Sequence, residues 1–182
     1  MPSSMTHLFI AKKVNSDASV DFYIGNLAPD ANRERDKKDI VHFVNVPDME
    51  TALKEFALKI DNDYLKGFLL HLYVDWKWNT TVLVDFINKI SGRWYPLYNE
   101  ENRKIVSYAF HNTEWAYSLY EDLENWDYNG FVRTEFITRE SIKEWISNSR
   151  KWMIENKLEP SAAFPPEHIE RFASDVAKDF IK

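Results

Sequence analysis

Apolar residues recur at helical spacing along most of the chain, whereas runs that alternate apolar and polar residues are weak. Only four glycines interrupt this pattern. It predicts an all-α or nearly all-α fold, a helical bundle. The predicted helices run from about Thr6 to Val14, Met49 to Ile60, Tyr64 to about Trp78 with a continuation to Gly92, Glu100 to Leu123, Arg139 to Asn156, and Glu167 to Ile181.

Residues with short polar side chains precede several of these segments and predict where the helices begin. The predicted caps are Thr6, Asp48, Asp61 or Asp63, and Thr138. In contrast, the segment from Ser19 to Asp36 contains Gly25, Asn26 and Pro29 and has no helical period. We expect it to form an ordered loop across the surface of the core.

Nothing along the chain marks a second domain, because neither an internal repeat nor a low-complexity linker occurs. Residues 1–182 are therefore predicted to form a single helical metal-binding domain. No run approaches the roughly 18 apolar residues that span a bilayer, and the start lacks a basic segment followed by an apolar one. These features predict a cytoplasmic protein without a transmembrane segment. The sequence carries no signal for an oligomeric state.

The charged residues narrow the classes of partner and ligand. The formal net charge is −6, and the basic residues are scattered rather than gathered into a stripe. This distribution argues against double-stranded nucleic acid as a partner. The chain has no cysteine, so His, Asp and Glu are its only strong metal ligands.

The central apolar segment contains His71 and Asp75. Residues four apart project from the same face of a helix, so both side chains can reach one ion. An ionised carboxylate inside an apolar segment needs a compensating partner. A metal ion would supply it, but a hydrogen bond between the two side chains is the simpler alternative.

Three further residues of ligand type stand at predicted helix starts and loop ends, and each also has an ordinary interpretation. Asp30 follows Pro29 and could be a turn residue. His42 could be a packed histidine bonded to a carbonyl. His7 could be an exposed residue in a first turn.

Taken together, these residues resemble the bacterial zinc-dependent phospholipase C family. The resemblance spans about residues 1 to 79 and rests on four ordered elements: Thr6-His7, Gly25-x-x-x-Pro29-Asp30, His42-Phe43 and Gly67-x-x-x-His71-x-x-x-Asp75. It implies an all-helical bundle, shared with single-strand-specific nucleases, in which a cluster of metal ions hydrolyses phosphate esters.

The resemblance also implies roles for individual residues. Asp30, His42, His71 and Asp75 would surround one ion, and His7 with a bridging Asp75 would help to hold a second. Two ions suit phosphoryl transfer because they stabilise both the attacking and the leaving oxygen. Asp30 would be the catalytic residue that orients or deprotonates the attacking water.

The sequence departs from the family pattern in two places. At least five residues precede Thr6-His7, where secreted members place a metal-binding N-terminal amine. After Asp75 no His occurs until His111, and the nearest downstream ligand pair is His111 with Glu114, spaced three rather than four. This pair could add a ligand to a further ion or simply form an ordinary side-chain pair.

The expected function is a metal-dependent phosphoester hydrolase acting on a small-molecule or lipid-like phosphate ester. Its cofactor would be one or two divalent ions, zinc first, since the same nitrogen and oxygen ligands also suit iron, nickel and manganese. Trp76, Trp78 and Asn79 would line the pocket mouth, unless the two tryptophans serve only in packing. The alternative is a noncatalytic helical metal-binding or scaffold protein that keeps the fold.

Overall fold

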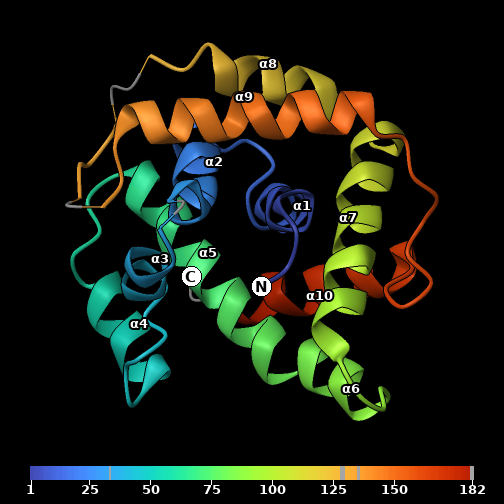
Figure 1. The fold of residues 1–182 in the computed structure, drawn as a ribbon. Helices are drawn as coiled ribbons and strands as arrows, with labels where there is room; N and C mark the ends of the chain where they lie inside the picture. The colour runs from blue at the N-terminus through green and yellow to red at the C-terminus, as the bar shows by residue number, and fades with distance from the viewer. Residues whose placement is uncertain (33, 128–129, 135, 181–182) are drawn as a thin grey trace.

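The computed structural model describes residues 1–32, 34–127, 130–134 and 136–180, and all regular secondary structure in these ranges is helical (Figure 1). The predicted all-α class is therefore confirmed. The elements are α1 (Ser4–Val14), α2 (Val20–Leu27), the 3-10 helix η1 (Ala28–Ala31), α3 (Arg35–Val41), α4 (Met49–Ala57), α5 (Asp63–Thr80), α6 (Val82–Asn88), α7 (Trp94–Asn112), α8 (Ala116–Glu124), α9 (Arg139–Glu155) and α10 (Pro166–Asp179).

Side chains cap the starts of five of the described helices, and two of these caps, Asp48 and Thr138, are the predicted ones. The Asp48 carboxylate accepts the main-chain N–H of Thr51 at 3.1 Å, and Thr138 forms a capping box with Ser141. The prediction of Asp61 or Asp63 for α5 was wrong, because the Asn62 side chain accepts the main-chain N–H of Leu65 at 2.9 Å. The first helix begins two residues before the predicted cap. Ser3, rather than Thr6, is its N-cap, since the Ser3 hydroxyl accepts the main-chain N–H of Thr6 at 3.2 Å.

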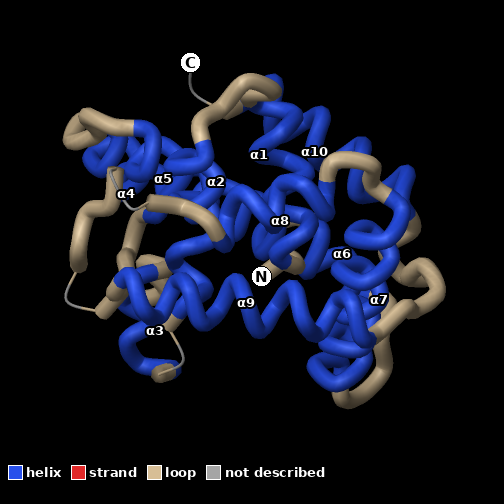
Figure 2. The backbone as a smooth tube through the Cα atoms, turned by 90° about the horizontal axis from the view of Figure 1, so that it is seen from above, coloured by secondary structure: helices blue, strands red, loops and turns tan. Residues whose placement is uncertain are grey.

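Helix α5 runs through the centre of the molecule and packs against α2, α4 and α6, while α1 contacts α2, α5, α7 and α10 (Figure 1). Helix α9 spans one side, in contact with η1, α7 and α8 (Figure 2). Buried apolar side chains from α1, α2, α5, α7, α9 and α10 join one hydrophobic cluster. Within the described ranges, every helix is too short or too polar to cross a bilayer.

Two glycines let α2 and α5 approach each other more closely than side chains would allow. A Cβ atom at Gly25 would overlap the main-chain carbonyl of Tyr64, and one at Gly67 would overlap that of Phe22. The two backbones are therefore in direct contact at this crossing. As a result, the last turn of α2 and η1 lie against the middle of α5.

The prediction of a loop from Ser19 to Asp36 was wrong, because this segment contains α2, η1 and the start of α3. Ser19 caps α2, its hydroxyl accepting the N–H of Phe22 at 3.4 Å. Gly25, which suggested a loop, serves instead for close helix packing. Tertiary contact with α5 thus overrides the weak helix propensity of glycine.

Two long predicted helices are each divided in the structure. The predicted continuation beyond Trp78 breaks at Thr81, where the backbone leaves the helical region and the hydroxyl donates to the Lys77 carbonyl at 2.6 Å. The predicted helix from Glu100 to Leu123 is two helices, separated by an extended backbone at Thr113. The aromatic stretch from Trp94 to Tyr98 forms the first turns of α7.

Candidate metal centre

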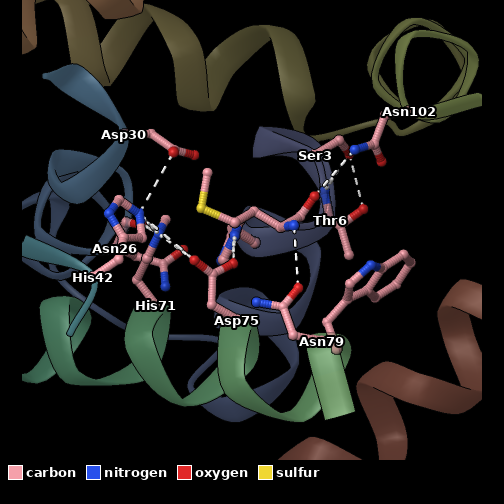
Figure 3. A network of polar contacts seen from close by, with 12 residues as sticks. Ser3, Thr6, Asn26, Asp30, His42, His71, Asp75, Asn79 and Asn102 are labelled. Atoms are coloured by element: carbon pink, nitrogen blue, oxygen red, sulfur yellow. Dashed lines mark hydrogen bonds and ion pairs between the residues drawn. The ribbon is translucent and has the colours of Figure 1, made fainter. Parts of the chain in front are cut away.

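Five side chains that the sequence singles out come together at the crossing of α1, α2 and α5. His7 comes from α1, Asp30 from η1, His42 from the residue after α3, and His71 and Asp75 from α5. Figure 3 shows Asp30, His42, His71 and Asp75 pointing toward one another. Their ligand atoms form two groups, each within 4.8 Å: His7 with His71 and Asp75, and Asp30 with His42 and His71.

Helix α5 positions His71 and Asp75 on one face, one turn apart, with His71 Nε2 3.4 Å from Asp75 Oδ2. The close approach of α2 fixes the other side of the His71 ring. His71 Nδ1 donates to the main-chain carbonyl of Asn26 at 2.7 Å. Because a carbonyl oxygen only accepts, Nδ1 carries the proton and Nε2 of the neutral ring carries the lone pair.

His42 is oriented in the same way by its own helix. Its Nδ1 donates to the main-chain carbonyl of Lys38 at 2.7 Å, one turn earlier. The chain then turns sharply, since Phe43 has a positive φ of 56° and packs edge-on against Phe56. Such a backbone angle is costly for an aromatic residue. It is tolerated where the chain leaves α3 and the His42 ring turns toward α5.

The two imidazoles therefore present their Nε2 atoms to each other, 3.1 Å apart. With both Nδ1 atoms protonated, each neutral ring has only a lone pair at Nε2, and two lone pairs repel at this separation. A cation bound by both nitrogens removes this repulsion, as does a proton on one ring. Metal-bound histidines commonly donate their other ring nitrogen to a carbonyl, as both do here.

His7 lies flat against His71, with the ring centroids 3.9 Å apart and the planes 5° from parallel. Its Nε2 is 3.3 Å from Asp75 Oδ1, yet neither ring nitrogen makes a hydrogen bond of normal geometry within the described ranges. Complete burial, together with His71, lowers the pKa of His7 to about 4. The ring is therefore neutral at pH 7 and available as a ligand.

Asp75 is the carboxylate that all three histidines share. His7, His42 and His71 each place Nε2 3.3–3.5 Å from one of its oxygens. In the described part of the chain neither oxygen accepts a hydrogen bond of normal geometry. Burial alone would raise the pKa of Asp75, but His71 and His7 lower it below its ordinary value. A buried carboxylate in this state needs a cation nearby.

Asp30 closes the group on the side of α3. Its Oδ1 lies 3.7 Å from His42 Nε2 and 2.5 Å from the Lys38 ammonium. Burial would raise the pKa of Asp30, but contact with His42 and the charge of Lys38 hold it well below the ordinary value. Asp30 is therefore ionised at neutral pH.

The structure does not bring His111 and Glu114 to this site. His111 Nε2 donates to the main-chain carbonyl of Met153 at 2.8 Å, so the ring joins α7 to the end of α9. Glu114 is exposed in the turn between α7 and α8. Neither belongs to a group that could hold an ion among the described residues. His111 thus has a structural role, but it pairs with the Met153 carbonyl and not with Glu114.

The residues expected at the pocket mouth have different positions. Trp78 is fully buried, and its indole donates to the Tyr98 hydroxyl at 2.8 Å, so it belongs to the core. Trp76 packs against Tyr73 on another face of α5. Only Asn79 lies beside the site, where it follows Asp75 by one turn (Figure 3).

Three features near the site escaped the sequence interpretation. The Asn26 carbonyl and Lys38 orient His71 and His42, and the segment before Thr6 folds back over the centre. The main-chain nitrogen of Met1 donates to Asn79 Oδ1 at 3.2 Å, and its carbonyl accepts from Asn102 at 3.1 Å. Spacing alone could have revealed Lys38, which precedes His42 by one helical turn.

Comparison with known proteins adds no assignment to this geometry: no family model, curated protein or solved structure matches the chain.

Proposed function

We propose that the protein is a metal-dependent hydrolase of phosphate esters. The observation that carries the proposal is the arrangement of His42 and His71, whose Nδ1 atoms are both committed to carbonyls while their Nε2 atoms face each other at 3.1 Å. Two carboxylates at the same point, one of them without hydrogen bonds of normal geometry, complete a ligand set of nitrogen and oxygen atoms. This set suits zinc first, and also iron, nickel or manganese.

Such a centre supplies two kinds of chemistry when an ion is bound: it lowers the pKa of a bound water and polarises a phosphoryl oxygen. The chain's own residues do the rest. His42 and His71 are held in the ligating tautomer by the carbonyls of Lys38 and Asn26. Asp30, ionised at the edge of the group, would orient the attacking water through a hydrogen bond to its carboxylate.

The ligand atoms limit how one or two ions could share these residues. His71 belongs to both groups, yet its Nε2 has one lone pair and can bind only one ion. A first ion would use His71 with neighbours from either group. A second ion would depend on the residues that remain, with Asp75 as the bridging carboxylate.

The substrate class of the proposal is a small or lipid-like phosphate ester. The chain has a net charge of −6, so an anionic ester needs a local positive charge to approach. The bound ion provides that charge at the site.

The proposal is tested by elemental analysis of wild type and His71→Ala, combined with a panel of phosphodiester and phosphomonoester substrates. His111→Ala is the matched control, because His111 bonds to Met153 far from the site. Wild type and His111→Ala are expected to bind metal and hydrolyse at least one ester, and His71→Ala to lose both properties. Wild type that holds no more metal than His71→Ala under metal-replete conditions refutes the proposal.

One observation favours a noncatalytic metal-binding or scaffold protein as the second candidate. The side chains of His7 and His71 are 0% exposed, and those of His42 and Asp75 only 3% and 4%. A closed shell of protein ligands is typical of structural sites, whereas catalytic sites keep a position for water. A metal-loaded protein that cleaves no member of the panel would support this second candidate.

A further inference from the structure

The side chains of the candidate centre become more exposed in one direction, toward α3. His7 and His71 are 0% exposed, Asp30 is 10% exposed, and Lys38, in contact with Asp30, is 27% exposed. The accessible edge of the group is thus formed by Asp30 and Lys38. A molecule from solvent that approaches from this side meets the Lys38 ammonium first.

Lys38 is held at this edge by two different contacts. Its ammonium lies 2.5 Å from Asp30 Oδ1, and its main-chain carbonyl accepts the Nδ1 proton of His42 at 2.7 Å. Its charge also acts on the main-chain nitrogen of Met1, where burial is the largest cause that lowers the pKa and Lys38 adds to it. The ammonium of Lys38 therefore lies against Asp30 at the edge of the site, while 27% of its side chain remains exposed.

The chemistry of an ammonium at this position differs from that of a structural salt bridge. An ammonium has three N–H donors, and that of Lys38 forms an ion pair with Asp30 Oδ1, which accepts no hydrogen bond of normal geometry within the described ranges. When Asp30 also serves an ion or a water, the ammonium shares that carboxylate and keeps donors for a second anion. Lysine beside phosphate groups acts as a point charge of this kind.

We propose that Lys38 is the group that binds a nonbridging oxygen of the phosphate at this site. This inference rests on the proposed function, because it places the phosphate group of the ester at the edge formed by Asp30 and Lys38. Lys38 would thus supply a fixed positive charge beside the ion, on the side from which the ester arrives. The ligand class is a phosphate group, either free or esterified.

Lys37 offers a matched control on the same helix. Lys37 carries the same charge as Lys38, and its side chain is 40% exposed. Its ammonium pairs with Glu34 at 2.5 Å and, within the described ranges, forms no ion pair with any of the five candidate ligands. A general effect of surface charge would therefore change when either lysine is removed. A specific phosphate contact would change only with Lys38.

The test measures inorganic phosphate binding by calorimetry, with and without zinc, for wild type, Lys38→Met, Lys38→Arg and Lys37→Met. Metal content and thermal unfolding are measured on the same samples. We expect Lys38→Met to keep its metal and lose about tenfold or more in phosphate affinity, as removal of a charge-assisted hydrogen bond predicts. Lys37→Met should match wild type, and Lys38→Arg should recover most of the affinity.

The outcomes separate this inference from the hydrolase proposal. Phosphate affinity in a folded, metal-loaded Lys38→Met equal to that of wild type overturns the inference, and so does a loss explained by lost metal. If phosphate binding depends on Lys38 but the protein cleaves no ester, the inference is supported and only the hydrolase proposal is contradicted. If wild type binds no metal, the hydrolase proposal fails, while the phosphate affinities of the metal-free proteins still decide the role of Lys38.

Discussion

His42 and His71 meet through their Nε2 atoms at 3.1 Å, although one follows α3 and the other lies in the middle of α5. Each ring is held from behind by a main-chain carbonyl, so neither can turn to relieve the contact without losing a hydrogen bond. The pair is therefore poised to share a proton or a metal ion.

This relationship predicts a specific signature in histidine nitrogen NMR spectra. In the metal-free protein, Nδ1 of His42 and His71 should be protonated, and adding zinc should shift their Nε2 resonances while Nδ1 stays protonated. The resonances of His111, which bonds to Met153, should not move. Zinc that shifts His111 and leaves His42 and His71 unchanged would contradict the assignment of the site.

Metal binding should also appear as stability. An ion that binds the folded protein raises the free energy of unfolding by about 3 kcal/mol at a hundredfold excess over its Kd. We expect this gain in thermal or urea unfolding of wild type and of His111→Ala. It should disappear in His71→Ala and on addition of a chelator; equal gains in all three proteins would point to a different binding site.

The pH dependence of the metal-free protein should reveal His7. Its pKa is about 4 in the folded protein, where burial is the main cause, against 6.5 ordinarily. Between these values the unfolded chain binds a proton that the folded protein does not, so stability falls as the pH drops through this window. The loss over the whole window is about 3 kcal/mol.

A comparison of wild type with His7→Phe isolates the contribution of His7. His71 acts in the opposite sense: burial lowers its pKa, but the contacts with Asp75, Asp30 and the Asn26 carbonyl together raise it, so its contribution is lost as the pH rises. Urea unfolding of wild type and His7→Phe between pH 4 and 7.5 separates the two. The difference in unfolding free energy between them should shrink as the pH falls, and parallel curves would show that His7 does not titrate in this window.

Even a single methyl group at Gly67 should lower the stability of the protein. A methyl group there would overlap the Phe22 carbonyl and push α2 away from α5. We expect Gly67→Ala to lower the free energy of unfolding by about 3 kcal/mol and to weaken metal binding, because the Asn26 carbonyl moves with α2. Gly92→Ala is the control: its Cβ meets nothing within 4 Å at φ 103°, so it should cost about 1 kcal/mol and leave metal binding unchanged.

Trp78 should behave as a core residue and not as part of a substrate pocket. Trp78→Phe removes the bond to the Tyr98 hydroxyl and leaves a small void, which should cost about 2 kcal/mol of stability. The KM for any ester found should stay within about twofold of wild type, a change worth less than 0.5 kcal/mol. A large rise in KM with unchanged stability would restore Trp78 to the pocket.

The sequence predicts the helical class and two of the caps because these depend on local chemistry. Asp48 and Thr138 show this, since each bonds to an N–H only three residues away. The helix from Val20 to Leu27 could not be predicted in the same way. Its Gly25 suggests a loop until the backbone of Tyr64, far along the chain, is placed against it.

In the candidate site too, some features could be predicted from the sequence and others depend on tertiary contacts. Order and residue type along the chain select His7, Asp30, His42, His71 and Asp75, and the structure brings all five together. The role of the Asn26 carbonyl could not be predicted, because it depends on where α2 ends relative to α5. Lys38, by contrast, precedes His42 by one helical turn, a spacing that the sequence shows. Residues 71, 75 and 78 share a helix face, but Trp78 lies against Phe164 and Phe172, so the alternative of a packing role fits it.

The chain has no cysteine and so forms no disulfide bond. An ion held by residues of α1, η1 and α5 and by His42 after α3 would tie together segments that are up to 68 positions apart, from His7 to Asp75. Closing a long loop restricts the unfolded chain much more than the folded one, as a disulfide does. The metal centre would then crosslink the N-terminal half of the chain. Removal of the ion should lower the stability of the short helix α3 against local unfolding before that of the central helix α5.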